Sequence, residues 1–173
     1  MRALVVYESM FGNTRRIAEA IAAGLEMSAQ VDLVAVGSAP AVLADDLDLV
    51  VVGGPTHAHG MTRPGTRTSA AEQAADTVTP AGTGLRDWLE AIRPRPGLAA
   101  ATFDTRFDKP GWLTGSAARG AAKRLQRSGC RLVASPESFY VLGTTGPVQD
   151  GELDRAYDWG RALGSQHPVT STR

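Results

Sequence analysis

Short apolar runs recur along this chain and predict β-strands. Two of the runs are continuous and rich in valine, which is typical of strands buried on both faces of a sheet. Another run alternates loosely and carries Asp32, which favours a strand near the sheet edge. In the last predicted strand, Ser135-Pro136 interrupts the pattern and predicts a bulge. The five predicted strands cover residues 3–7, 31–36, 48–52, 98–103 and 131–134, the last resuming at 139–142.

Between these runs, apolar residues recur every three or four positions and predict amphipathic helices. The first helix follows the first strand directly, with Ile17, Ile21 and Leu25 on one face. A long polar segment at 57–82 contains Pro64, Gly65 and Pro80, and it is expected to be a functional or a disordered loop, with room for a short helix at 69–76. The remaining helices are predicted at residues 39–45, 85–92, 117–125 and 150–163.

Strands and helices therefore alternate, which predicts an α/β fold with one parallel sheet covered on both faces. We expect a three-layer, doubly wound, five-stranded sheet, for which 2-1-3-4-5 is a common strand order. This order places the ligand site where strands one and three diverge. The loops after those strands, at residues 9–14 and 53–61, are rich in glycine, proline, serine, threonine and histidine.

The loop at residues 9–14, SMFGNT, has the chemistry of a phosphate site. A helix that starts directly after a strand presents unpaired N–H groups and the positive end of its dipole. Ser9, Asn13 and Thr14 offer further hydrogen bonds, and Gly12 allows the backbone to approach a phosphate. The alternative is an ordinary strand-to-helix turn, capped by Asn13 or Thr14.

Composition narrows the function classes. The chain has 173 residues with 18 basic and 18 acidic side chains, so neither nucleic acid nor a membrane surface is expected as a partner. Its one cysteine, Cys130, excludes an internal disulfide and a cysteine zinc site. No apolar run has the length of a signal peptide core or a membrane span, which favours a cytoplasmic protein. One domain is predicted at residues 1–164, followed by a polar tail at 165–173.

Three motifs together resemble the flavodoxin family. YESMFGNTRRIAEAI is similar to the flavin-phosphate loop and its helix, DLVVVGGPTHAHGM to the third strand and first ring-contacting loop, and TFDTRF to the second ring-contacting loop. The resemblance covers nearly the whole chain, apart from an insertion at 62–82. It implies the doubly wound fold, the cofactor FMN and one- or two-electron transfer. The cofactor-binding residues that it implies are Ser9, Met10, Phe11, Gly12, Asn13, Thr14, Pro55, Thr56, His57, Ala58, His59, Gly60, Phe103, Asp104, Thr105, Arg106 and Phe107.

The chain also departs from the carrier flavodoxins. Phe11 replaces the threonine that is usual there, and the overall charge is balanced instead of strongly acidic. The pattern Ser-Met-aromatic-Gly instead resembles the flavodoxin domains of flavodiiron proteins and the NAD(P)H:quinone oxidoreductase branch. An electron carrier that serves a reductase and an acceptor protein is expected. The alternatives are an FMN-dependent NAD(P)H:quinone oxidoreductase and a flavin-free regulatory or interaction domain.

Other candidate residues favour simpler interpretations. His57 and His59 either contact the flavin or are solvated, and they lack a third nearby ligand for a metal. Arg106 either meets the flavin pyrimidine edge or is a surface charge. We assign no catalytic residue and no metal ligand, because neither a Ser/His/Asp set nor a carboxylate pair is evident.

Overall fold

The computed structural model describes residues 1–57, 60–61, 83–109 and 115–166. The sheet strands are β1 (Arg2–Tyr7), β2 (Gln30–Ala35), β3 (Leu49–His57), β5 (Ala99–Phe107), β6 (Arg131–Leu132) and β7 (Glu137–Val141). The short β4 (Gly60–Met61) pairs antiparallel with β3. The helices are α1 (Asn13–Leu25), α3 (Leu85–Ala91), α5 (Ala117–Arg127) and α6 (Glu152–Ser165), with a 3₁₀ turn at Val36–Ser38.

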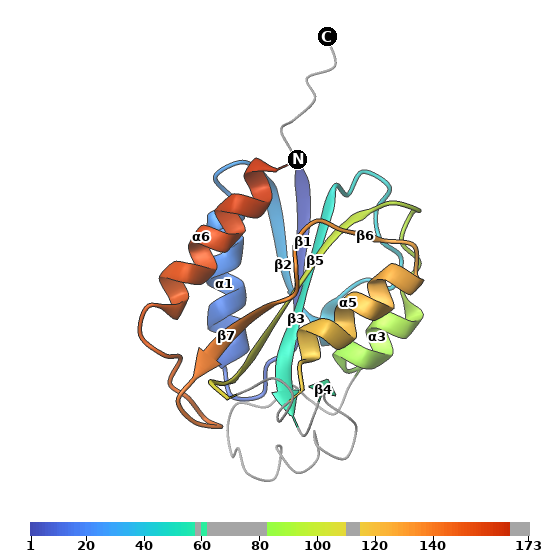
Figure 1. The fold of residues 1–173 in the computed structure, drawn as a ribbon. Helices are drawn as coiled ribbons and strands as arrows, with labels where there is room; N and C mark the ends of the chain where they lie inside the picture. The colour runs from blue at the N-terminus through green and yellow to red at the C-terminus, as the bar shows by residue number, and fades with distance from the viewer. Residues whose placement is uncertain (58–59, 62–82, 110–114, 167–173) are drawn as a thin grey trace.

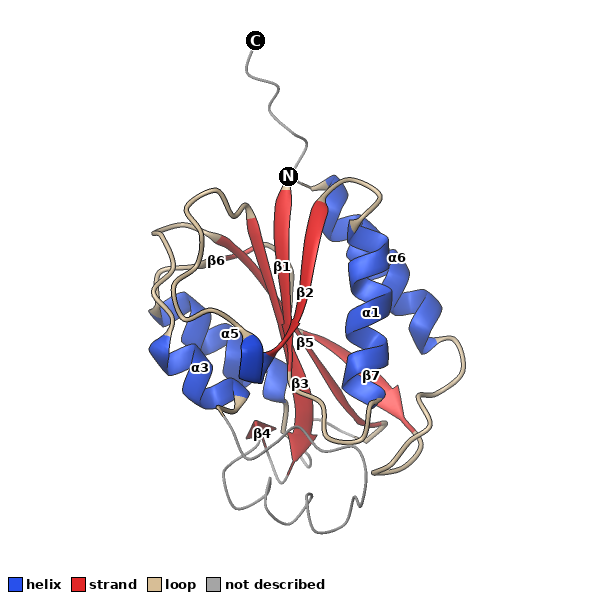
Figure 2. Ribbon diagram, turned by 180° about the vertical axis from the view of Figure 1, so that it is seen from behind, coloured by secondary structure: helices blue, strands red, loops and turns tan. Residues whose placement is uncertain are grey.

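The predicted fold class and strand order are confirmed. The parallel strands lie in the order β2-β1-β3-β5, and β5 then pairs with β6 near its start and with β7 near its end. The break between β6 and β7 contains the predicted Ser135-Pro136 interruption. Helices α1 and α6 cover one face of the sheet, and α3 and α5 cover the other (Figure 1, Figure 2).

Two expectations about the strands were wrong. The third and fourth strands were expected to end at residues 52 and 103, but β3 runs to His57 and β5 to Phe107. Gly53-Gly54 does not form a turn there, because both residues pair with β5. A Cβ at Gly53 would lie 2.1 Å from the Phe103 ring, and one at Gly54 would lie 2.9 Å from Leu85. The glycines therefore make room for side chains on the two faces of the sheet.

The helix expected at residues 39–45 is absent from the described structure, which has an irregular segment with one bridge residue and a turn there. The Pro40 carbonyl accepts a hydrogen bond from the Trp88 indole N–H at 3.0 Å, and Val42 forms a parallel bridge with Arg93. Contacts with α3 therefore satisfy the backbone that a helix would otherwise have paired. The short helix expected at 69–76 lies outside the described residues.

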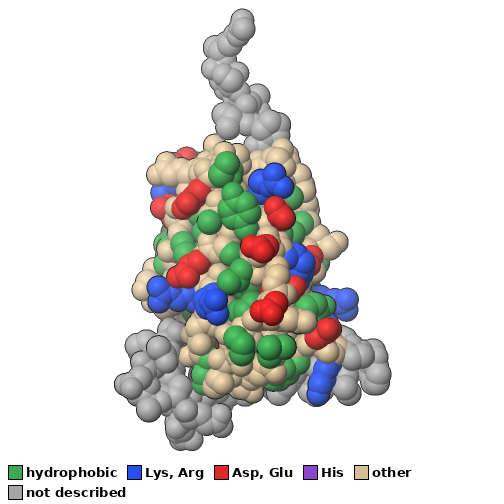
Figure 3. Space-filling model, turned by 90° about the vertical axis from the view of Figure 1, so that its left-hand side faces the viewer, with side chains coloured by type: hydrophobic (Ala, Val, Ile, Leu, Met, Phe, Trp, Pro, Cys, Tyr) green, Lys and Arg blue, Asp and Glu red, His purple; other side chains and the backbone are tan. Residues whose placement is uncertain are grey.

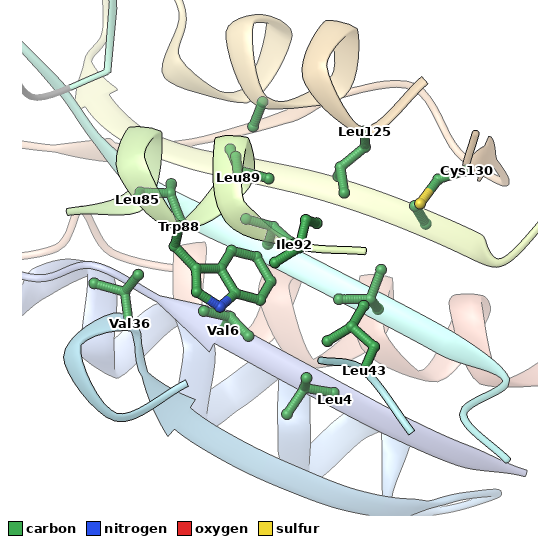
Figure 4. Close-up of a cluster of buried hydrophobic side chains, with 14 of the residues drawn as sticks. Leu4, Val6, Val36, Leu43, Leu85, Trp88, Leu89, Ile92, Leu125 and Cys130 are labelled. Atoms are coloured by element: carbon green, nitrogen blue, oxygen red, sulfur yellow. The ribbon is translucent and has the colours of Figure 1, made fainter. Parts of the chain in front are cut away.

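The sheet separates two hydrophobic cores. The core under α3 and α5 contains Trp88, which is held between α3 and the strands (Figure 4). The core under α1 and α6 contains Phe103 and Phe139, whose ring centroids are 6.3 Å apart in an edge-to-face arrangement. Trp159 packs against both of these rings, so this tryptophan serves packing. Acidic and basic side chains are interspersed over the face seen from the α6 side (Figure 3).

Helices α1 and α6 cross at unusually short range because glycines line their contact. A Cβ at Gly24 would lie 2.1 Å from the Tyr157 carbonyl oxygen, and one at Gly160 would lie 2.2 Å from the Ile21 carbonyl oxygen. A Cβ at Gly164 would lie 2.2 Å from the Ser28 hydroxyl, a side-chain atom beyond the end of α1. At Gly24 and Gly160 the neighbour is backbone, so any side chain there would force the helices apart.

The close crossing predicts that a glycine-to-alanine change at the α1–α6 contact lowers stability, whereas the same change in a helix away from this contact raises it. Gly160→Ala should lower the free energy of unfolding by about 1–3 kcal/mol, because the added methyl overpacks the crossing. Gly120→Ala in α5 should raise it by up to about 1 kcal/mol, because the nearest atom to its Cβ is Met61 Cε at 3.4 Å, an ordinary contact, and alanine favours a helix. Urea unfolding of both variants measures the difference, and a Gly160→Ala protein as stable as the parent would contradict the close crossing.

Candidate functional site

A cavity opens at the carboxyl ends of the parallel strands. Its space is about 470 Å³, counting the part open to solvent. Its walls come from the segments after β1 and β7 and from the ends of β3 and β5. The lining residues are Ser9, Met10, Phe11, Asn13, Thr14, Pro55, Thr56, Thr105, Arg106, Phe107, Val141 and Thr144.

The N-terminus of α1 opens on this cavity without a cap. Gly12 precedes the helix with a φ of 85°, a conformation that glycine adopts without strain, and its N–H donates to Ser9 Oγ at 3.1 Å. The first helical bond runs from Arg16 N–H to Gly12 O. No side chain caps the helix, and its first turn contains no acidic residue. The amides of Asn13, Thr14 and Arg15 are therefore available to an anion.

The other helices of the described structure begin differently, because each has a carboxylate at its first turn. Glu8 Oε2 accepts from the Leu85 N–H of α3 at 2.9 Å. Asp104 Oδ2 accepts from the Ala118 N–H of α5 at 3.0 Å. Helix α6 has Glu152 and Asp154 in its first turn. The starts of α3 and α5 thus have carboxylate acceptors within the protein, and α6 has acidic residues in its first turn although no side chain caps it. The start of α1 has neither, and it faces the cavity.

Asp104 is fully buried and joins β5, β3 and α5. Its Oδ2 also accepts from the Ser116 hydroxyl at 2.6 Å and the Thr56 hydroxyl at 3.0 Å. Thr56 in turn accepts from the Ala117 N–H at 2.8 Å. This network fixes the start of α5 against the strand ends, and it holds Thr56 in the cavity wall.

On the opposite face, a hydrogen bond fixes α1 to the sheet. The hydroxyls of Thr14 and Thr105 lie 2.7 Å apart, and both residues are buried. The uncapped start of α1 is therefore held at a fixed position relative to the end of β5.

Most of the residues predicted from the phosphate-loop motif line the cavity. Of the residues predicted from the second ring-loop motif, some line the cavity and others are buried away from it. Thr105, Arg106 and Phe107 line it, but Phe103 lies in the core and Asp104 lies behind the wall. This division follows position along β5, which runs through the whole TFDTRF motif: residues 105–107 reach the cavity at the carboxyl end of the strand, whereas Phe103 and Asp104 lie deeper in the molecule on opposite faces of the sheet. Phe107 remains 40% exposed at the rim.

Arg106 organises the segment that follows β5. Its guanidinium donates to the carbonyls of Gly115 at 3.0 Å and Lys109 at 3.3 Å. It also lies 5.9 Å from the centroid of the Tyr140 ring. The positive charge is thus held at the cavity wall by backbone contacts.

In the first ring loop, Pro55 and Thr56 line the cavity, while His57 ends β3 and pairs with Gly60 of β4. Ala58 and His59 lie outside the described residues. In the described part of the chain, no group of histidine, cysteine or acidic residues could hold a metal ion.

Sequence reasoning missed the wall that follows β7. Val141 and Thr144 line the cavity, and the neighbouring Gly146 approaches Asn13 so closely that a Cβ there would lie 2.5 Å from Asn13 Oδ1. The signal was the GTTGP sequence at residues 143–147, a glycine-rich loop after the last strand. Loops after parallel strands all lie at the same edge of the sheet.

An ionic cluster holds β7 and α6 together beside this wall. Glu152 is 8% exposed, and its Oε2 accepts from the Tyr140 N–H at 2.7 Å and from Arg155 Nη2 at 2.6 Å. Arg155 also pairs with Glu137 and stacks 4.4 Å from the Phe139 ring centroid. Burial raises the pKa of Glu152, but the bonds from Arg155 and Tyr140 outweigh it and hold the pKa below its ordinary value.

Comparison with known proteins agrees with this architecture. A family model described as a flavodoxin domain matches residues 4–64, a span that includes α1, β2 and β3. No curated protein sequence matches the chain. A flavodoxin from the domain Archaea is 19% identical, with a TM-score of 0.66 over 96% of this chain and 98% of that one.

Two other solved structures represent further branches. A WrbA-like flavodoxin from Agrobacterium tumefaciens is 22% identical, with a TM-score of 0.54 over 96% of this chain and 98% of that one. The flavodiiron protein from Giardia intestinalis is 19% identical, with a TM-score of 0.61 over 95% of this chain but 36% of that protein chain. The flavodoxin resemblance and the flavodoxin-like fold are thereby confirmed. None of the described helices is long and apolar enough to span a membrane.

The lowered pKa of Glu152 predicts a loss of stability in acid. A depressed carboxyl pKa contributes stability above the unfolded value of about 4.3, and this contribution disappears as pH falls through the folded pKa. Glu152→Gln should therefore cost about 1–3 kcal/mol near pH 7 and progressively less below about pH 4.

Urea unfolding of parent and variant across this pH range measures the effect. Glu19→Gln is the matched control, because Glu19 is exposed and pairs with Arg15 one helical turn away, an arrangement worth at most about 0.5 kcal/mol. A destabilisation by Glu152→Gln that stays constant from neutral to acid pH would contradict the ionic role of Glu152.

Proposed function

We propose that this flavodoxin-like chain binds FMN and transfers electrons between redox partner proteins. The observation that carries the proposal is the uncapped N-terminus of α1, which faces the cavity, while each of the other described α-helices begins beside a carboxylate. An anion is the ligand that such a helix end favours, and a phosphate matches several N–H donors at once.

The residues present fit FMN along the whole cavity. The amides of Asn13, Thr14 and Arg15, with the Asn13 side chain, would hold the phosphate. The half-exposed Phe107 offers apolar surface for the flavin ring. Thr56 and Thr105 place polar atoms in the same wall. When bound, FMN supplies the redox chemistry, in one- or two-electron steps.

The chain's own residues determine how the cofactor is positioned. The Thr14–Thr105 hydrogen bond fixes the phosphate end relative to β5. The Asp104 network fixes Thr56 relative to α5. Arg106 keeps a positive charge at the wall, where it would stabilise an anionic cofactor. Both ends of the site are thus preorganised by bonds that do not involve the ligand.

We assign the carrier role, with a reductase and an acceptor protein as partners, in preference to the quinone oxidoreductase. Phe107 lines the cavity at the end of β5 and is 40% exposed, and Leu142, which directly follows the lining residue Val141 of β7, is 66% exposed. An exposed apolar rim suits transient contact with a partner surface. The balanced charge of the chain implies that electrostatic steering contributes little to the encounter.

The phosphate assignment predicts that FMN binds at least 100-fold more tightly than riboflavin. Gly12→Ala should weaken FMN at least tenfold and riboflavin much less, because alanine resists the φ of 85° and displaces the helix amides. Isothermal titration calorimetry on flavin-free protein measures both affinities.

Gly151→Ala is the matched control for this experiment. Gly151 is the N-cap of α6 with a φ of 82°, and a Cβ at either glycine meets no atom within 4 Å. Both variants carry the same backbone strain, so only Gly12→Ala should change FMN binding. Equal affinities for FMN and riboflavin would sink the phosphate assignment, and a protein that binds neither would favour the flavin-free alternative.

The carrier role predicts slow direct turnover. With FMN bound, oxidation of NADH or NADPH by a small quinone should proceed well below about 1 s⁻¹, the lower end of ordinary enzyme rates. The Gly12→Ala protein, assayed with the same total FMN, gives the background from free flavin. Turnover of tens per second that requires bound FMN would establish the oxidoreductase alternative instead.

A further inference from the structure

A groove runs beside the start of α1, next to the cofactor cavity. Its open space is about 1000 Å³, so it is larger and more exposed than the cavity. Phe11 and Asn13 line both spaces, which therefore adjoin at the N-terminus of α1. The groove residues are Phe11, Gly12, Asn13, Arg15, Arg16, Glu19, Thr145, Gly146 and Pro147.

The groove has a positive wall and a neutral wall. The positive wall is the first turns of α1, where Arg15 Nε pairs with Glu19 Oε1 at 2.8 Å. Arg16 is exposed and forms no ion pair with any described residue, so one positive charge remains uncompensated. The opposite wall, Thr145 to Pro147, carries no charge. An anionic group is therefore the chemistry that this groove favours.

The position of the groove indicates which end of a flavin it would extend. The two spaces share Phe11 and Asn13, at the start of α1, where the helix N-terminus favours a phosphate. The residues Thr56, Thr105 and Phe107 at the strand ends do not line it. A ligand portion in the groove would thus continue from the phosphate and not from the flavin ring.

On the basis of the proposed function, we propose that the site accepts a flavin extended at its phosphate, with the AMP half of flavin adenine dinucleotide in the groove. Arg16 supplies the charge for the second phosphate. Phe11 and Pro147 supply apolar surface for the adenine, and aromatic rings favour stacking with bases. The phenylalanine in the phosphate loop, where carriers have threonine, thereby acquires a role at the junction of the two spaces.

The test compares riboflavin, FMN and flavin adenine dinucleotide by calorimetric titration of flavin-free protein at one ionic strength. We expect the dinucleotide to bind within tenfold of FMN. Arg16→Gln should weaken the dinucleotide about tenfold and FMN less than threefold. Arg119→Gln is the matched control, because Arg119 is an exposed arginine in the first turn of α5 and lines neither space; it should change neither affinity.

Each result decides between interpretations. A dinucleotide that binds more than tenfold more weakly than FMN would overturn the inference, and so would equal weakening of both ligands by Arg16→Gln. Neither result would affect the FMN proposal, which fails only if FMN binds no better than riboflavin.

Discussion

The carboxyl edge of the sheet depends on one requirement: the backbone N–H groups at the helix starts need hydrogen-bond acceptors. Helices α3 and α5 begin where the strands end, and buried amides there require acceptors. Glu8 and Asp104 meet this requirement from the ends of β1 and β5, so the two carboxylates hold α3 and α5 in place. The start of α1 has neither a side-chain cap nor an acidic residue in its first turn, and it faces the cavity. The same physical requirement therefore builds the walls of the cavity and leaves the place for an anion.

Much of the fold follows from the sequence, because buried parallel strands and amphipathic helices leave strong patterns. Strand ends were harder to predict. Gly53-Gly54 has the composition of a turn, yet its glycines accommodate Phe103 and Leu85 across the sheet, a packing effect between distant segments. The TFDTRF motif was interpreted as a loop, so Phe103 and Asp104 were grouped with residues that line the cavity. Only the extension of β5 by pairing with β7 divides them between the faces.

The candidate site was likewise predictable from the sequence only where its residues follow one another along the chain. Residues on the first loop could be chosen from local chemistry, since the strand, glycine and helix follow one another directly. Thr144 and Gly146 could not be chosen in that way, because their place beside Asn13 depends on how β7 and α6 return to the first helix. The carboxylate of Glu8 likewise gave no local signal, because its partner Leu85 lies on a helix far along the chain.

The close crossing of α1 and α6 has a consequence for how the protein comes to be made. Helix α1 emerges early in synthesis, but the glycine contacts that seat it come from the last described helix. Contacts between segments so distant along the chain form late, after most of the loop-closure entropy has been lost. Within residues 4–64, Ile17 and Ile21 already have Val5, Leu49 and Val51 of the sheet as partners. The side of α1 that contacts α6 must therefore remain uncovered on the ribosome until the last described helix has been made. Residues 4–64, which the flavodoxin-domain model matches, thus reach their final packing only after the last described helix has docked.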